Sequence, residues 1–252
     1  MGGGWPDLWA DLARPDTAWL ALFAVLAGLV RGFSGFGAAL VFMPLGALVA
    51  EPRDLRVAFL VMNVFGPLPL MPEALRRADG REVMRLSLGA VLGVPLGIWL
   101  LTSVDPAGFR LLVALICLAA LAAFLSGWRY QRRPGPAVKL GTGFLAGVGG
   151  GFAGVAGPPV VLFYLGGQRG AVEIRSALIV FFYASTWLSV AVIAVSGLLT
   201  WHAVLLGAAL TVPHTLAGMA GGRLFALAGE RDFRYAAYAI MGVAALLALP
   251  IY

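Results

Sequence analysis

The chain has 252 residues, of which 61% are hydrophobic and only 12% are charged, and its formal net charge is +6. Soluble domains contain about 45–50% apolar and about 25% charged residues, so this composition excludes an ordinary soluble protein and indicates a polytopic membrane protein. The basic residues form short clusters between apolar runs. We therefore expect membrane lipids, and no nucleic acid, around the chain.

Residues 1–16 are expected to form an N-terminal interfacial lead-in. The segment carries three aspartates and one arginine, which is the wrong charge for the start of a cleaved signal peptide. Trp5 and Trp9 fit an aromatic belt at the membrane–water interface.

A bilayer core accommodates roughly 20 apolar residues per helix, and on that measure the rest of the chain divides into eight predicted spans. Their ranges are 17–49, 56–72, 83–104, 107–128, 140–167, 174–199, 201–225 and 234–251. Segment 129–139, which is polar and contains proline and glycine, is the expected linker between a first transmembrane repeat, 17–128, and a second, 140–252. The predicted fold class is an all-α polytopic membrane protein with about eight transmembrane helices in two homologous four-span halves.

The two halves share a sequence pattern at a constant offset. Gly32-Phe33-Ser34-Gly35 aligns with Gly151-Phe152-Ala153-Gly154. Continuing without a gap, Asp54-Leu55-Arg56 aligns with Glu173-Ile174-Arg175. An internal duplication explains both matches, and it makes the two glycine-rich segments the equivalent centres of the two halves.

The first span is too long for one straight helix. Residues 17–49 would extend about 50 Å as an α-helix, against a hydrocarbon core of about 30 Å. Glycines between residues 32 and 37 supply a break, and the fifth span has a similar excess with a break at 149–159. We expect both segments to be broken or re-entrant. Counting four spans per half makes the repeats parallel, whereas re-entrant hairpins would change that count.

Glycines at four-residue spacing predict helix faces that a neighbouring helix can approach closely. Gly89, Gly93 and Gly97 form such a face in the third span, and Gly218 and Gly222 do so in the seventh. For orientation, the dense basic clusters at residues 76–85 and 129–139 favour a cytoplasmic position for the loops after the second and fourth spans. The termini would then be cytoplasmic as well.

Arg31 is the one charged residue that can be placed well inside an apolar span, away from the span ends. A centrally placed arginine is costly and is by default a functional-site hypothesis. The alternative is that Arg31 snorkels to the interface or pairs structurally. Its guanidinium keeps its charge and matches the oxygens of a sulfonate, sulfite or carboxylate, so beside a broken helix it predicts an anion site.

The glycine breaks independently favour anion binding. A helix unwound at mid-membrane frees backbone N–H groups, and the half-helix that follows points its positive end at the break. The alternative is that the glycines only allow tight packing, and that the polar residues of the spans only form interhelical hydrogen bonds. The candidate substrate-binding residues are Arg31, Ser34, Gly35, Asn63, Gly150, Gly151, Gly154, Tyr183, Ser185 and His214.

No enzymatic, metal or cofactor site is expected. Gly149-x-Gly151-x-x-Gly154 matches the dinucleotide fingerprint, but no strand precedes it and its surroundings suit a bilayer. The only histidines, His202 and His214, have no carboxylate or cysteine nearby in the sequence. All twelve acidic residues lie outside the predicted spans, so we expect no proton or sodium relay through an intramembrane carboxylate.

With two four-span halves, each opening with a glycine-rich segment followed by an acidic-x-Arg pair, the chain resembles the sulfite exporter TauE/SafE family of bacterial anion permeases. The similarity extends over residues 20–250, and it is carried by the Gly32–Gly37 run, the Gly147–Gly151 run, Arg56 and Arg175, and the paired glycines of the third and seventh spans.

The resemblance implies a secondary transporter that exports small sulfur-containing or organic anions, such as sulfite or sulfonates, across the bacterial cell inner membrane. Such a protein would work by alternating access around a mid-membrane site between the two broken helices, and a homodimer is compatible with it. An anion channel or uniporter, and an accessory membrane subunit without transport activity, are the alternatives.

Overall fold

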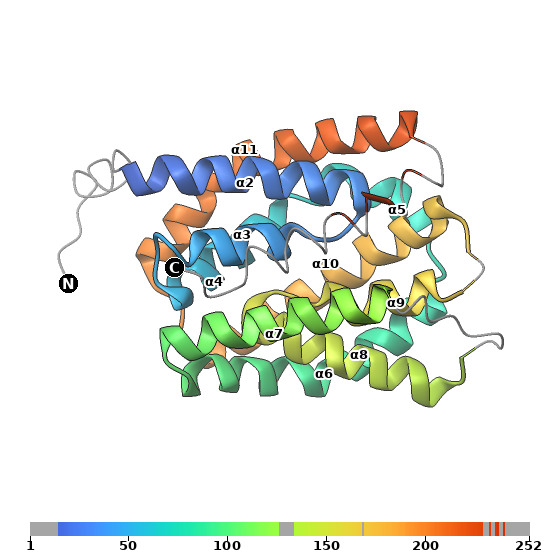
Figure 1. Ribbon diagram of the computed structural model, residues 1–252, viewed down its shortest axis with the longest axis horizontal. Coiled ribbons are helices and arrows are strands. Elements are labelled where there is room, and N and C mark those ends of the chain that lie inside the picture. The colour runs from blue at the N-terminus through green and yellow to red at the C-terminus, as the bar shows by residue number, and fades with distance from the viewer. Residues whose placement is uncertain are drawn as a thin grey trace.

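The computed structural model describes residues 15–125, 134–167 and 169–228, together with residues 232, 235, 236 and 239. Within these residues all the regular structure is helical (Figure 1). Among the described residues, five helices are long and apolar enough to cross a membrane: Asp16–Ser34, Pro52–Arg77, Gly80–Ser103, Ala171–Val195 and Trp201–Leu227. An all-α protein with membrane-crossing helices is therefore confirmed. The layout of eight spans in two halves stays a prediction, and residues 1–14 and most of 234–251 lie outside the described residues.

The first predicted span forms a helical hairpin. Helix α2 (Pro15–Ser34) ends at a short turn, and α3 (Ala38–Gly46) then runs back beside it (Figure 1). The turn requires glycine, because Gly35 and Gly37 have φ angles of 80° and 84° in the left-handed region. The first segment is therefore a helical hairpin and is not a straight helix with a kink.

The fifth predicted span repeats this hairpin. Helix α8 (Pro136–Ala153) ends at Gly154, whose φ angle is 71°, and α9 (Gly157–Leu165) runs back along it. The Gly154 N–H donates to the Gly150 carbonyl at 2.9 Å, which is the hydrogen bond of an αL helix end, and the Val155 N–H donates to the Gly149 carbonyl at 3.0 Å. Helix α8 begins at Pro136, inside the predicted linker.

The remaining helices connect and surround the two hairpins. In chain order they are α4 (Pro52–Phe65), the 3₁₀ turn η1 (Leu68–Leu70), α5 (Met71–Arg77), α6 (Gly80–Ser103), α7 (Pro106–Leu125), α10 (Ala171–Val195) and α11 (Trp201–Leu227). Helices α2 and α8 run in opposite directions along the long axis of the molecule (Figure 1). The two hairpins therefore enter from opposite ends, and their tips approach each other in the middle.

Each hairpin packs against a helix from the other part of the chain. Helix α6 lies along α8, and α11 lies along α2. The predicted glycine face of α6 makes the first contact possible, because a Cβ on Gly93 would lie 2.2 Å from the Phe144 carbonyl oxygen. In the second contact, a Cβ on Gly32 would lie 1.9 Å from the Gly218 carbonyl oxygen. The two parts of the chain are thus interlocked rather than placed side by side.

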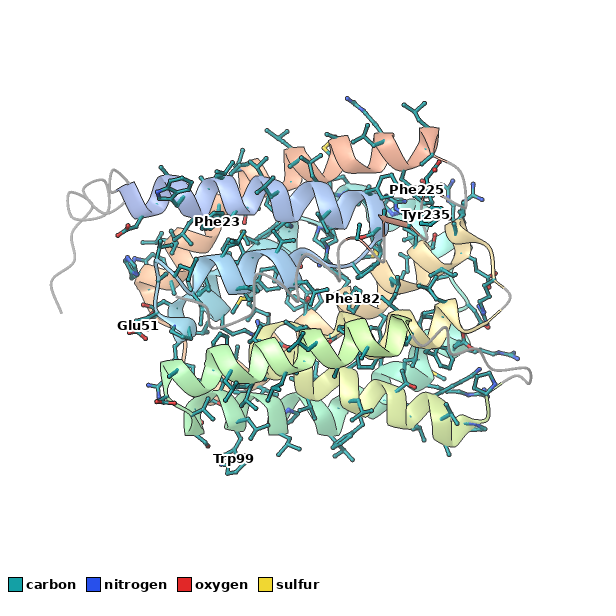
Figure 2. All side chains as sticks on the ribbon, viewed as in Figure 1. Phe23, Glu51, Trp99, Phe182, Phe225 and Tyr235 are labelled. Atoms are coloured by element: carbon teal, nitrogen blue, oxygen red, sulfur yellow. The ribbon has the colours of Figure 1, made fainter. Side chains whose placement is uncertain are left out.

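Large apolar side chains point outward from the long helices, as Trp99 of α6 does in Figure 2. Trp99 is 59% exposed and Leu92, on the same helix, is 73% exposed. An outward-facing apolar surface of this kind suits contact with lipid.

The two ends of the molecule are held by different interactions. At one end the buried carboxylate of Glu82 lies 2.5 Å from Lys139 Nζ and 2.9 Å from Arg169 Nη2, and Arg169 also pairs with Glu173. Partial burial raises the pKa of nearby Asp79, but the Glu82 N–H and the Arg169 charge outweigh burial and hold that pKa below its usual value. At the other end the Thr200 hydroxyl donates to Asp54 at 2.9 Å.

Replacing Gly93 by alanine should destabilise the protein, because the new methyl group would collide with backbone of α8 that has no room to move. We expect a loss of about 1–3 kcal/mol in unfolding free energy, the usual range for overpacking. Thermal unfolding of the purified protein in detergent measures it. Gly141→Ala is the matched control, because its Cβ would meet nothing within 4 Å. An unchanged melting temperature for Gly93→Ala would contradict the close α6–α8 contact.

Candidate functional site

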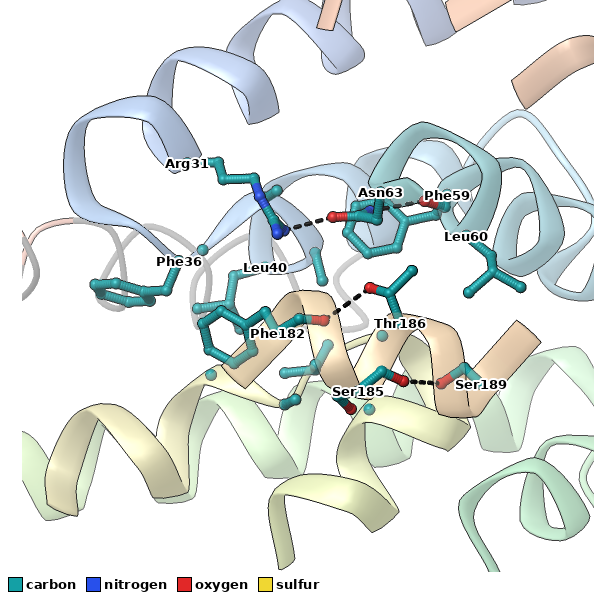
Figure 3. Close-up of a pocket in the computed structure, with 18 of the residues that line it drawn as sticks. Arg31, Phe36, Leu40, Phe59, Leu60, Asn63, Phe182, Ser185, Thr186 and Ser189 are labelled. Atoms are coloured by element: carbon teal, nitrogen blue, oxygen red, sulfur yellow. Dashed lines mark hydrogen bonds between the residues drawn. The ribbon is translucent and has the colours of Figure 1, made fainter. Parts of the chain in front are cut away.

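A cavity of about 50 Å³ lies where the tips of the two hairpins meet (Figure 3). Its wall comprises the end of α2, the first turn of α3, one face of α4, the second hairpin tip and one face of α10. One buried water needs about 10–15 Å³, so the cavity has room for a few waters or one compact anion. A larger groove of about 490 Å³ between α7, α8 and α9 is almost wholly apolar and offers little to a charged solute.

Arg31, in the last turn of α2, supplies one of the two positive charges in the cavity wall, and Arg56 supplies the other. Its Nη1 donates to Asn63 Oδ1 on α4, and Asn63 Nδ2 in turn donates to the Phe59 carbonyl at 2.7 Å. The side chain is 7% exposed, and its Nε and Nη2 are buried without a hydrogen-bond partner. Arg31 therefore does not snorkel to the surface, and it holds two free donors at the cavity.

The first turn of α3 adds backbone donors. Gly37 stands at the N-cap without a side-chain cap, and residues 37–40 line the cavity. The N–H groups of Ala38, Ala39 and Leu40 precede the first intrahelical bond, which Val41 donates to Gly37. The positive end of a helix and a free guanidinium thus converge on one small space, which favours negative charge.

The opposite wall of the cavity carries hydroxyl groups from α10. Ser185, Thr186 and Ser189 line it below Arg31 and Asn63 (Figure 3). Thr186 donates to the Phe182 carbonyl at 2.8 Å and Ser189 to the Ser185 carbonyl at 3.0 Å. These two hydroxyls therefore face the cavity mainly as acceptors, so they can receive a hydrogen bond from a hydroxyl or a protonated oxyanion.

The second hairpin has no equivalent of the Arg31 site. At the constant offset of the duplication, Arg31 matches Gly150 and Asn63 matches Phe182. The first turn of α9 contains Pro158 and Pro159, which lack N–H groups. The positive charge and most of the backbone donors therefore come from one side of the cavity.

Arg56 of α4 forms part of the wall and holds the second hairpin. Its Nη2 donates to the Gly150 carbonyl at 2.8 Å and its Nε to the Gly151 carbonyl at 3.3 Å. Those carbonyls belong to the last turn of α8, where the Gly150 carbonyl also accepts from the Gly154 N–H at 2.9 Å. Arg56 is 2% exposed and therefore links α4 to the second hairpin tip from inside the protein.

The structure brings part of the predicted set together. Five of the predicted residues line the cavity, namely Arg31, Asn63, Gly150, Gly154 and Ser185. The other five lie outside its wall, namely Ser34, Gly35, Gly151, Tyr183 and His214.

Those outside have identifiable contacts of their own. The Ser34 Oγ lies 2.8 Å from the Val30 and Phe36 carbonyls and accepts from the Phe36 N–H, and Gly35 packs on the backbone of Arg175. Gly151 packs on α6, Tyr183 makes an edge contact with Trp187, and the His214 Nδ1 lies 3.1 Å from the Ala24 carbonyl. They shape the hairpins and the helix contacts around the cavity.

Four features of the wall were not among the candidates: the first turn of α3, Arg56, Thr186 and Ser189. The two missed hydroxyls carry a readable signal, because Ser189 lies four residues after the candidate Ser185 and therefore on the same face of the helix, and Thr186 is its immediate neighbour. Arg56 was visible as the repeat mate of Arg175. In the part of the chain that the structure describes, no group of three His, Cys, Asp or Glu residues could hold a metal ion.

A chain of membrane-crossing helices around a buried, positively charged cavity belongs to the class of multi-pass membrane transport proteins. Comparison with known proteins narrows this class: the family model for the sulfite exporter TauE/SafE matches residues 20–248. The chain therefore belongs to the TauE/SafE family, whose members are transporters and not enzymes, and the resemblance seen in the sequence is confirmed.

A curated relative supports this membership. The Probable sulfite/organosulfonate exporter TauE of Cupriavidus necator is 26% identical over 225 residues, which cover 86% of this chain and 88% of the relative. No solved structure matches the chain.

Asn63 is the hydrogen-bond partner of a buried guanidinium, so its replacement should test the geometry of the cavity. Asn63→Leu should lower the unfolding free energy by about 1–3 kcal/mol, because Arg31 loses its acceptor while it stays buried. Asn63→Asp should be no less stable than the native protein, because a carboxylate pairs with the guanidinium. Thermal unfolding at low ionic strength measures both, and equal destabilisation by the two variants would contradict the Arg31–Asn63 contact.

Proposed function

We propose that this protein exports small sulfur-containing or organic anions, such as sulfite and sulfonates, and binds them in the cavity beside Arg31. The observation that carries the proposal is the pair of buried, unpartnered Arg31 nitrogens at the uncapped start of α3. A buried guanidinium with two free donors is costly to maintain, and a bound oxyanion would satisfy both. The exporter named in the curated relative agrees with this chemistry.

The arrangement of donors suits a compact tetrahedral or pyramidal oxyanion. Two oxygens can accept from the Nε and Nη2 of Arg31, because the guanidinium fork matches pairs of anionic oxygens. A third oxygen can face the first-turn N–H groups of α3. The hydroxyls of Ser185 and Ser189 then lie toward the rest of the solute. A sulfonate with a small polar tail would use every part of this wall.

We further propose that the cavity alternates between the two sides of the membrane through the two interlocked halves. Eight spans in two halves, with the hairpins as matched centres, would form an inverted repeat, because α2 and α8 run in opposite directions (Figure 1). Rocking of one half against the other would open the cavity to one side and close it to the other. The ion pairs of Glu82 with Lys139 and Arg169 hold helices together at one end of the molecule, which agrees with a cavity that is closed toward that end.

Export along this route needs no coupling ion in our proposal. An anion leaving a cell with a negative interior is driven outward by about 2.3 kcal/mol per charge per 100 mV. Among the described residues, the one buried carboxylate is Glu82, and it is already paired with Lys139 and Arg169. The proposed setting is the bacterial inner membrane with cytoplasmic termini, as the basic clusters favour.

The proposed function is tested by anion binding to the purified protein. We expect sulfite or a sulfonate such as isethionate to raise the melting temperature, acetate and chloride to do so less, and Arg31→Ala to leave only the small shift that the start of α3 supports. Asn63→Asp is the matched control, because the new carboxylate keeps Arg31 in place but neutralises its charge. This variant should be folded yet insensitive to anions. The same variants in liposomes should lose anion flux, and counterflow of substrate would separate a transporter from a channel.

A native protein that no sulfur oxyanion or sulfonate stabilises would overturn the proposed substrate class. An Arg31→Ala variant that responds like the native protein would show that the guanidinium is not the anion ligand. In that case the start of α3 would be the next group to test, with Ala38→Pro as the variant, because proline is tolerated at the first helical position and removes one of the N–H groups there.

A further inference from the structure

An arginine in the last turn of a helix can hydrogen-bond the terminal carbonyls of its own helix. Arg31 occupies that position in α2, and a carbonyl is available there. The Phe36 N–H, which would otherwise approach the Gly32 carbonyl, donates to the Ser34 hydroxyl. The end of α2 therefore presents an unmet acceptor one residue away from Arg31, inside the protein, where such a group must find a partner.

A different arginine meets that acceptor. Arg175 of α10 donates to the Gly32 carbonyl from Nη2 at 2.6 Å and from Nε at 3.1 Å. The guanidinium is held in place by the Phe225 ring, whose centroid lies 4.5 Å from Cζ, and the side chain is 7% exposed. Arg175 does not line the cavity, so it has no contact with a solute bound there.

We propose that Arg175 is a positioning residue that keeps Arg31 free for the anion. By capping the end of α2, Arg175 removes the acceptor that would draw the Arg31 guanidinium back onto its own helix. Arg31 then extends to Asn63 and leaves its Nε and Nη2 at the cavity. The inference rests on the proposed anion site, and it assigns a role in that site to a residue outside it.

The second hairpin provides an internal comparison. Arg56 caps the end of α8 in the same way, and it is the repeat mate of Arg175. The position in α8 that matches Arg31 is Gly150, which has no side chain to release. In both hairpins a matched arginine thus caps the end of the first helix. Only the cap made by Arg175 lies next to a cationic side chain, Arg31, that can bind the anion.

Arg175→Gln should lower the affinity for methanesulfonate by about tenfold or more, the scale of one charge-assisted hydrogen bond, measured by calorimetry on the folded protein. A structure of the same variant should show the Arg31 guanidinium on the carbonyls of the last turn of α2 instead of on Asn63. Arg77→Gln is the charge-matched control, because Arg77 is an exposed residue paired with Glu73, and its affinity should equal that of the native protein.

A double-mutant cycle separates positioning from general damage to the fold. In an Arg31→Gln background, where binding relies on the start of α3, adding Arg175→Gln should cause no further loss of affinity. An equal loss in both backgrounds would overturn the proposal, since Arg175 would then act without Arg31. Native affinity in Arg175→Gln, with Arg31 still on Asn63, would overturn it as well.

Two outcomes keep this test independent of the proposed function. If Arg175→Gln does not fold, Arg175→Lys is the second variant, because it retains a cation for the Gly32 carbonyl. It should restore both the fold and most of the affinity. A folded Arg175→Lys protein with Arg31 drawn back onto α2 would overturn the proposal. If the native protein binds no sulfonate, the proposed function fails on its own, and the position of Arg31 in the variant structure still decides the role of Arg175.

Discussion

A helix that stops inside a membrane protein leaves terminal carbonyls that neither water nor lipid can satisfy, and this constraint governs the centre of the fold. Here two helices stop there, α2 and α8. Each exposed end is capped by an arginine from the other part of the chain, with Arg175 on Gly32 and Arg56 on Gly150 and Gly151. Both arginines are buried. The hydrogen bonds that cap the two helix ends therefore also hold the two parts of the chain together.

The same centre is symmetric in its backbone and asymmetric in its chemistry. Both hairpins turn at glycines with positive φ, and both lean on a helix of the other part through glycine faces. The polar side chains differ: Arg31 and Asn63 stand on one side, where the matched positions hold Gly150 and Phe182. A symmetric frame with one cationic wall can present a single anion site at the meeting point of two hairpins, where two equal sites would repel each other's ligands.

Much of this arrangement could be read from residue patterns. The excess length of the first and fifth segments predicted breaks, and the glycines located them to within a few residues. Arg31 stood out because charge in an apolar span is costly, and Asn63 because amides there need partners. Ser34 and His214 were chosen by the same reasoning but face neighbouring backbone, because polarity within a span does not reveal which side of the helix meets a cavity.

The sequence by itself determined the class of protein, the two breaks and the position of Arg31 within an apolar segment, because composition, length and periodicity are properties of the chain alone. Only the tertiary structure decided that each break is a hairpin, that α2 and α8 oppose each other, and that Arg175 and Arg56 cross over to cap them. Those features depend on contacts between residues about a hundred positions apart, where no local pattern constrains the partner. Two nitrogens of Arg31 stay free because Arg175, far away in the sequence, already donates to the carbonyl at the end of α2.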